Sequence, residues 1–283
     1  MATVRRALSG AIFAVLFSLG LFFNRTQPLI PWIVCIVTAI GIWEFFKFAE
    51  RKDFKAQGVL ACFIGVLTVV EAYHFGLRHL PVLLTAALLS SFLLQLLRYG
   101  PDHFLAHVSI TFLGCFYVSL PMAMGMAVFH GPGHITGSRF LIFFLILTVW
   151  SSDIGAYFIG RAWGRRKLAP RISPGKTVEG MLGGFGAILL TASAVKLLWP
   201  EVSRMLLWPE VIALALVFCV VGLAGDLTES ALKRDAGVKN SSGFDFTGHG
   251  GMLDIIDSLL FCLPVFYLYC CYLYPRLHPE LCP

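Results

Sequence analysis

The amino-acid sequence is dominated by apolar runs that are long enough to cross a lipid bilayer. The stretches LIFFLILTVW (141–150) and VIALALVFCVVGL (211–223) contain no charged residue. Hydrophobic residues make up 58% of the 283 residues and charged residues only 13%, whereas a soluble domain carries about 25% charge. A water-soluble fold could not bury this much apolar surface, so the bilayer must be the solvent for most of the chain.

A helix that crosses the hydrocarbon core needs roughly 20 mostly apolar residues. On this criterion the sequence predicts an all-α, polytopic membrane protein with about nine transmembrane helices, at about 7–23, 29–48, 58–75, 80–97, 104–129, 140–160, 178–199, 208–225 and 255–274. The first segment follows two arginines as a signal peptide would, but no small-residue cleavage site follows it, so we interpret it as a retained helix. The eight cysteines form no CxxC pair and are interpreted as small buried hydrophobic residues.

The distribution of basic residues predicts the orientation. With a cytoplasmic N-terminus, most of the 22 lysines and arginines fall in inside segments, as the positive-inside rule requires. The C-terminus would then lie outside, and the two longest polar loops, 161–177 and 226–254, would share the cytoplasmic face. We therefore divide the chain into N-terminal helices (1–139) and a C-terminal region (140–283) that carries both loops. The net charge of +6 is explained by loops that face anionic lipid and does not require nucleic acid.

Acidic residues gather in the second of these loops. Of the 16 in the chain, the following lie between 226 and 257: Asp226, Glu229, Asp235, Asp245, Asp254 and Asp257. Acids near hydrocarbon are costly unless they are paired or bound to metal. Asp226, Glu229 and Lys233 would share one face if the preceding helix continues through them. Asp254 and Asp257 repeat the three-residue spacing at the start of the last span.

Two carboxylate pairs on either side of the flexible Gly-His-Gly-Gly turn (248–251) would suit Mg²⁺, which takes oxygen ligands and keeps waters for substrate phosphates. Lys233, Arg234 and Lys239 supply the positive charge that a triphosphate needs. The alternative is a charged loop that only solvates its helix ends. Asp235 and Asp245 are more simply explained in that way, and His249 fits either a turn residue or a phosphate contact.

A second polar group runs from Trp150 to Gly180. Asp153 interrupts the sixth span and is expected to face the bundle interior. Ser-Pro-Gly-Lys-Thr (173–177) is similar to the end of a P-loop, but the first glycine of that motif and its parallel sheet are missing, so we exclude a Walker site. The basic residues between 161 and 171 either set the topology or bind a phosphate or an anionic lipid headgroup, and the two roles are compatible.

Three ordered blocks in this part of the chain match a known family signature. They are Ser152-Asp153-x-Gly155-Ala156-Tyr157; Lys167-Leu168-Ala169-Pro170-x-Ile172-Ser173-Pro174-x-Lys176-Thr177-x-Glu179-Gly180; and Gly225-Asp226-Leu227-x-Glu229-Ser230-x-x-Lys233-Arg234, followed by Lys239 and His249-Gly250-Gly251-x-x-Asp254-x-x-Asp257-Ser258. In them the chain resembles the phosphatidate cytidylyltransferase family, also called CDP-diacylglycerol synthase. The resemblance is close over roughly 150–260, and elsewhere it extends only to an apolar chain with many spans.

The chain departs from the family pattern at three positions. Asn240 stands where the family usually has Asp, Thr247 where it usually has Pro, and Ile255 where it usually has Arg. The lost acid and the lost arginine cancel in charge. These departures bear on turnover and lipid preference, and the acids expected to bind metal are all retained.

The resemblance implies that the phosphate of phosphatidate attacks the α-phosphate of CTP, giving CDP-diacylglycerol and pyrophosphate for phospholipid biosynthesis. It implies Mg²⁺ as cofactor, held by Asp226, Asp254 and Asp257, and allows a second metal ion, including a monovalent one. It assigns catalytic roles to Asp226, Glu229, Lys233, Asp254 and Asp257. It assigns substrate-binding roles to Asp153, Lys167, Ser173, Lys176, Glu179, Ser230, Arg234, Lys239, His249 and Gly250.

Three other functions stay open at this point. A secondary transporter would also carry intramembrane acids, although we see no internal repeat. A non-catalytic scaffold would bind CTP or Mg²⁺ without turnover, and a related transferase would use CTP with another lipid phosphate. A short polar N-terminus favours a bacterial plasma membrane with the site facing the cytoplasm, and a homodimer is compatible with the sequence.

Overall fold

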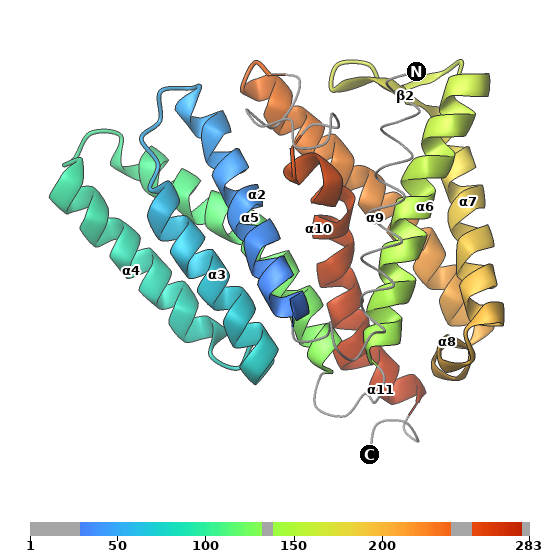
Figure 1. Ribbon diagram of the computed structural model, residues 1–283. Helices are drawn as coiled ribbons and strands as arrows, with labels where there is room; N and C mark the ends of the chain where they lie inside the picture. Colours follow the sequence, from blue (N-terminus) through green and yellow to red (C-terminus); the bar gives the residue numbers. More distant parts are fainter. Residues whose placement is uncertain (1–28, 132–137, 239–250, 279–283) are drawn as a thin grey trace.

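The computed structural model describes residues 29–131, 138–238 and 251–278, and within them the chain is almost entirely helical (Figure 1). Within these described ranges, eight helices are long and apolar enough to cross a bilayer. They are α2 (Ile30–Glu50), α3 (Gly58–Phe75), α4 (Leu80–Arg98), α5 (Phe104–His130), α6 (Ser138–Trp163), α7 (Val178–Leu198), α9 (Trp208–Asp235) and the run Leu253–Leu277 that contains α10 (Leu253–Leu268), a π-helix (Tyr269–Leu273) and α11 (Tyr274–Leu277). The all-α membrane fold and eight of the predicted spans are thereby confirmed, and the segment 7–23 lies outside the described residues.

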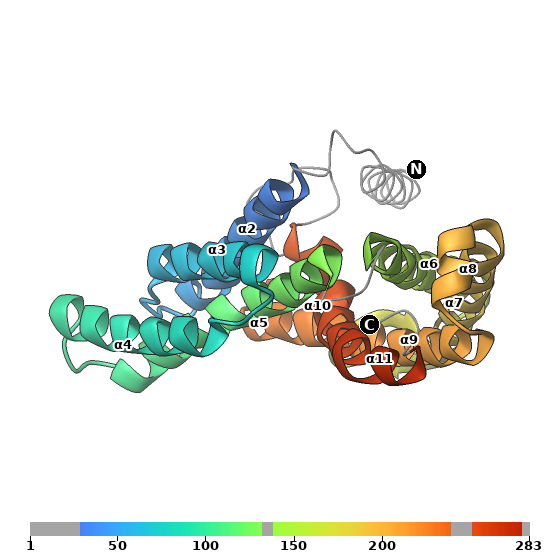
Figure 2. The ribbon, with the colours of Figure 1, turned by 90° about the horizontal axis from the view of Figure 1, so that it is seen from below.

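The helix α10 lies between two groups of helices. Figures 1 and 2 show α2 to α5 on one side of it and α6 and α7 on the other, while α9 crosses it. Accordingly, α10 packs against α2 and α5 as well as against α6 and α9. Any charged residue at the start of α10 is therefore close to both groups. A short helix, α8 (Pro200–Met205), connects α7 to α9 at the end of the bundle that lies away from the start of α10.

The described parts of the two long polar loops lie at the same end of the bundle, as predicted. The guanidinium Nε of Arg234 donates to the carbonyl oxygen of Ile172 at 3.2 Å, and this bond joins the end of α9 to the loop after α6. The basic segment after α2 also reaches this end, where Lys52 forms an ion pair with Asp235. We call this end of the bundle, which carries the hairpin segment, the end of α9 and the segment after α2, the polar end. Its cytoplasmic orientation stays a prediction.

The structure corrects the prediction for both loops. The helix α9 does not end near residue 225 but continues to Asp235. Asp226, Glu229 and Lys233 are therefore all helical, as a shared face requires. The segment 161–177 is not an open loop. Its strands β1 (Lys167–Ala169) and β2 (Ser173–Thr177) form an antiparallel hairpin, with Lys167 opposite Thr177.

Close packing of α6 against α7 holds this hairpin in place. A Cβ added to Gly155 would lie 2.3 Å from the Cβ of Ala187, and a Cβ added to Gly183 would lie 2.3 Å from that of Ile159. Only glycine allows the two backbones to approach so closely, as is common where helices associate within membranes. Thr177 ends the hairpin and begins α7, because its hydroxyl oxygen accepts the N–H of Gly180 at 3.1 Å.

Candidate active site

Three carboxylates from three helices gather at the polar end. We call Asp153 of α6, Asp226 of α9 and Asp257 of α10 the acid cluster. Asp257 lies within electrostatic range of both other members, and the hydroxyl of Ser258 donates to Oδ1 of Asp153 at 3.5 Å. Lys176 of β2 forms an ion pair with Asp226. The hairpin therefore brings a cation to carboxylates that would otherwise repel one another.

A second charged group lies beside the acid cluster and is organised by one lysine. The ammonium of Lys233 forms ion pairs with Glu229, one turn earlier on α9, and with Asp254 in the first turn of α10. Glu229 is completely buried, with 0% of its surface exposed. Removing a charge from water costs several kcal/mol unless it is well paired, so Lys233 is needed to hold the two carboxylates together.

The pairing of the acids differs from the pairing expected from spacing. The sequence groups Asp226 with Glu229 and Asp254 with Asp257. In the structure Asp226 lies near Asp257, and Glu229 shares its lysine with Asp254. The physical reason is that α9 and α10 run in opposite directions (Figure 1), so the first acid on one helix faces the second acid on the other.

Gly225 sets the distance between α9 and α10 at this point. A Cβ added to Gly225 would lie 2.5 Å from the backbone oxygen of Asp257, closer than real Cβ atoms come. One turn earlier on the same helix, a Cβ at Gly222 would meet its nearest neighbour, the Sγ of Cys262, at an ordinary 3.5 Å.

We therefore expect Gly225→Ala to push the two helices apart, to reduce activity and to lower the melting temperature in detergent, because overpacking typically costs about 1–3 kcal/mol. Gly222→Ala is the matched control and should leave both quantities close to those of the wild type. Equal behaviour of the two variants in thermal unfolding and turnover assays would contradict this account of the interface.

A cavity of about 470 Å³ opens beside the acid cluster, between α6, α7, α9 and the hairpin, and we call it the polar cavity because charged side chains form part of its lining. Its lining includes the charged side chains of Asp153, Asp226, Lys176 and Arg161. Asp153 is exposed to this space rather than packed in the apolar core. The volume is within the range of about 300–1,000 Å³ that small-molecule sites occupy, and the mixed charges suit a ligand that carries phosphate and metal.

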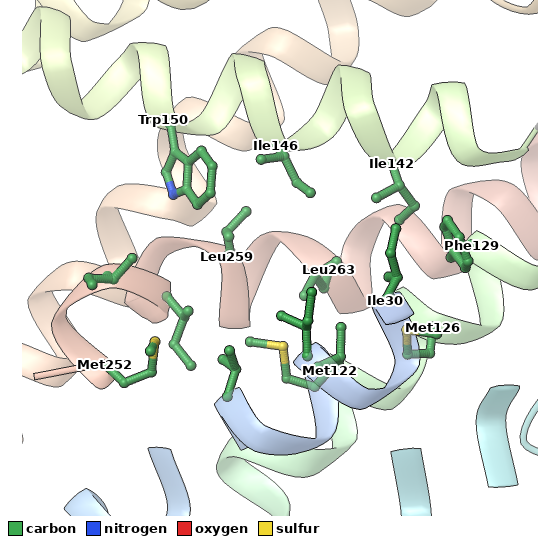
Figure 3. Close-up of a pocket in the computed structure, with 16 residues that line it drawn as sticks. Ile30, Met122, Met126, Phe129, Ile142, Ile146, Trp150, Met252, Leu259 and Leu263 are labelled. Carbon is green, nitrogen blue, oxygen red and sulfur yellow. The ribbon is translucent and has the colours of Figure 1, made fainter. Parts of the chain in front are cut away.

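A separate apolar cavity of about 90 Å³ lies between α2, α5, α6 and α10 (Figure 3). Every side chain that lines it is apolar. Figure 3 shows Trp150 and Ile146 of α6 opposite Leu259 and Leu263 of α10. The cavity begins beside the charged residues, because Met252 and Ile255 flank Asp254 and Trp150 precedes Asp153 by one turn.

Ile255, one of the three departures from the family pattern, is among the side chains that line this apolar cavity. An arginine at this position would have to bring its charge to an otherwise apolar wall. With isoleucine at position 255, the α10 side of the cavity is apolar from Met252 to Leu263.

The remaining predicted substrate residues have different positions. Lys167 is exposed on the hairpin, and Arg234 is exposed and bonded to Ile172. Ser173 begins β2, and the hydroxyl of Ser230 donates to Oδ1 of Asp226 at 3.4 Å. The structure brings Ser230 and Lys176 to the acid cluster but leaves Lys167 and Arg234 at the surface. Lys239, His249 and Gly250 lie outside the described residues, as do Asn240 and Thr247.

Glu179 has a structural role that the sequence did not suggest. Its carboxylate accepts the backbone N–H groups of Arg165, at 2.9 Å, and Arg166, at 3.1 Å. It thereby fixes the turn between α6 and β1. Its expected contact with substrate stays a prediction.

Sequence reasoning missed two residues of the N-terminal helices. Glu44 of α2 is buried and accepts hydrogen bonds from the start of α10. The hydroxyl of Tyr117 of α5 is also buried, and it lies within electrostatic range of Asp257 and Glu229. Glu44 could have been found from the sequence, because an acid inside an apolar span is a functional candidate by default.

The three residues predicted to bind metal are divided between the two charged groups. Asp226 and Asp257 belong to the acid cluster, whereas Asp254 pairs with Lys233. Across the part of the chain that the structure describes, no three His, Cys, Asp or Glu side chains are arranged to hold a metal ion by themselves. The donors nevertheless fit Mg²⁺ in kind, since it binds through one or two carboxylates and completes its shell with water and substrate phosphates.

These features define a class of protein: a multi-pass helical membrane protein whose polar end holds a charged site next to a polar cavity and an apolar one. Comparison with known families agrees with that class and also identifies the family. The sequence matches the cytidylyltransferase family over residues 4–273. The chain belongs to this family.

Similar proteins cover nearly the whole chain. The phosphatidate cytidylyltransferase of Haemophilus influenzae is 34% identical, and the match covers 93% of this chain and 96% of the relative. The enzyme of the same name from Pseudomonas aeruginosa is also 34% identical, over 93% of this chain and 95% of the relative. That of Bacillus subtilis is 30% identical, over 93% and 96%.

Proposed function

We propose that this protein transfers a cytidylyl group from CTP to phosphatidate, giving CDP-diacylglycerol and pyrophosphate for phospholipid biosynthesis. The family and the names of its relatives support this reaction. The observation that carries it in this chain is that the charged residues line one cavity, which is polar in part, and lie next to the lining of a second, apolar cavity. One substrate is a soluble nucleotide and the other a two-chain lipid, so a site for both must be open to both environments.

In the proposed reaction a phosphate oxygen of phosphatidate forms a bond to the α-phosphorus of CTP. The bond from that phosphorus to the bridging oxygen of the β-phosphate breaks, and pyrophosphate leaves with the electron pair. Phosphatidate is already an anionic nucleophile, so the protein does not need to supply a nucleophilic side chain. Catalysis then depends on positioning and on neutralising the charge of the phosphates.

The residues around the polar cavity can perform these two tasks. Lys176 and Arg161 face the cavity and would bind phosphate oxygens there. Asp226, supported by Asp257 or Asp153, would hold Mg²⁺, which would neutralise phosphate charge when bound. Lys233 is occupied by Glu229 and Asp254. We therefore assign it to fixing Asp254 rather than to the direct phosphate contact expected from the sequence.

We further propose that the protein lies in a bacterial inner membrane with its polar end in the cytoplasm. The supporting observations are the eight apolar helices and the bacterial relatives. Basic residues such as Arg51, Lys52 and Arg166 belong to segments at the polar end of the bundle, as the positive-inside rule requires of a cytoplasmic face. Such a location would give the polar cavity direct access to CTP.

The test is an assay of the purified protein with phosphatidate, labelled CTP and Mg²⁺. We expect CDP-diacylglycerol and pyrophosphate to form in equal amounts, and both to disappear when phosphatidate is omitted or EDTA is added. Binding of CTP without release of pyrophosphate would indicate a scaffold and contradict the proposal. Turnover with another lipid phosphate but not with phosphatidate would indicate a related transferase, and CTP-independent flux of a solute across vesicles would indicate a transporter.

A further inference from the structure

The start of α10 is held by a carboxylate from a helix that is more than 200 residues away in the sequence. Oε1 of Glu44 accepts the backbone N–H of Met252 at 3.0 Å, and Oε2 accepts that of Leu253 at 2.8 Å. Only 3% of the Glu44 surface is exposed. The first N–H groups of a helix have no partner within it, and α10 has no side-chain cap on its N-cap residue, Met252. Glu44 supplies the missing acceptors from α2.

A second carboxylate continues the same arrangement. Oδ2 of Asp254 accepts the N–H of Gly251 at 2.7 Å, while its Oδ1 contacts the ammonium of Lys233. Three successive N–H groups, from residue 251 to residue 253, are thus bound by the carboxylates of Glu44 and Asp254. The orientation of Asp254 is therefore coupled to that of Glu44 through the intervening backbone.

The packing of α2 against α10 supports this coupling. A Cβ added to Gly41, one turn before Glu44, would lie 3.5 Å from Cδ1 of Ile256. The two helices are therefore already in contact where Glu44 reaches across. A negative charge is also favourable at a helix N-terminus, because the N–H groups and the helix dipole present positive charge there.

We infer that Glu44 is a positioning residue for the active site: it fixes the first turn of α10 and so sets the places of Asp254 and Asp257 opposite α9. Glu44 acts through the backbone of α10 and does not touch the substrate. This inference rests on the proposed function for its kinetic consequences, but the contact itself can be measured without turnover. Through Glu44, the N-terminal helices help to position active-site residues in addition to anchoring the chain in the membrane.

The kinetic test compares Glu44→Gln with the wild type in the full-length protein. The amide has only one acceptor oxygen, so one of the two N–H groups loses its partner and the turn shifts. We expect kcat to fall about 10- to 100-fold, as small misplacements of catalytic groups can cause, with the KM for CTP changed less than about threefold. Glu44→Asp keeps both acceptor oxygens on a shorter side chain and should recover part of kcat.

Glu71→Gln is the matched control. Glu71 is also a buried glutamate in an apolar helix, and its Oε1 accepts a backbone N–H, that of His79, at 2.8 Å. This contact lies at the opposite end of α3 from the polar end. The control should keep its kcat. If both glutamine variants lose kcat equally, or if neither does, the positioning role of Glu44 is refuted.

Hydrogen–deuterium exchange tests the contact independently of catalysis. The amides of Met252 and Leu253 should exchange faster in Glu44→Gln than in the wild type, while those in the middle of α7 should be unchanged. Unchanged exchange at residues 252 and 253 would overturn the inference even if the enzyme is active. A wild-type protein with no CTP-dependent turnover would instead overturn the proposed function and leave this measurement as the test of Glu44.

Discussion

Replacing Asp226 by Asn should reduce the rate of CDP-diacylglycerol formation about 10²–10³-fold, by analogy with the loss of one electrostatic contact in other active sites. Asp226 lines the polar cavity, pairs with Lys176 and lies near Asp257. It is the one acid predicted from spacing that also belongs to both the acid cluster and the cavity wall. The amide keeps the size of the side chain and removes its charge, so Lys176 would lose its ion-pair partner and the proposed Mg²⁺ would lose a carboxylate ligand.

The same variant should remain folded. Members of the acid cluster repel one another, so removing one charge relieves repulsion among those that stay. We therefore expect the melting temperature of Asp226→Asn in metal-free buffer to equal or exceed that of the wild type. Added Mg²⁺ should stabilise the wild type through binding to the native state and should have a smaller effect on the variant.

Asp235→Asn is the control for Asp226. It removes an acid from the same helix, but Asp235 is exposed and pairs only at the surface, with Lys52. Exposed pairs contribute little to stability, so this variant should keep both turnover and melting temperature. Turnover near the wild-type level in Asp226→Asn would show that the metal assignment is wrong.

Replacing Lys233 by Met should have the largest effect on stability. The lysine is the cation shared by Glu229 and Asp254, and Glu229 is fully buried. Removing one partner of a buried ion pair typically costs about 3–5 kcal/mol, because an uncompensated charge stays behind. We expect a markedly lower melting temperature and loss of activity, measured by thermal unfolding in detergent and by the CTP assay.

A double variant separates the two effects of Lys233→Met. Glu229→Gln combined with Lys233→Met removes the buried charge together with its partner, so much of the lost stability should return. Activity should not return, because Asp254 still lacks the ammonium that orients it. If the double variant is no more stable than Lys233→Met alone, the ion pair is not the cause of the destabilisation. If it regains full activity, Lys233 does not position Asp254.

The sequence was most informative where hydrophobicity alone decides the structure. Apart from the end of α9, the apolar runs predicted the bounds of the eight membrane helices among the described residues within a few residues, because a bilayer requires a certain length of apolar helix. The prediction was less accurate at the polar end. The ten residues that extend α9 to Asp235 and the hairpin at 167–177 depend on hydrogen bonds and packing with other elements, which no apolar pattern records.

The candidate site was predicted in part. Asp226, Asp254, Asp257 and Lys233 were identified as a charged group because acids at a membrane boundary are costly without a function. Their spatial pairing was not predictable from spacing, since it depends on α9 and α10 being antiparallel. The division of the expected metal ligands between the acid cluster and the Lys233 group has the same origin.

The amino-acid sequence by itself determined that this protein is a helical membrane protein, that its charges gather between residues 150 and 260, and which family it resembles. These properties follow from local composition and from the order of motifs. Only the tertiary structure decided which acid faces which, that Lys176 reaches Asp226 from the hairpin, and that Glu44 holds the start of α10. Each of these contacts joins separate elements of the chain, so each depends on how the helices pack.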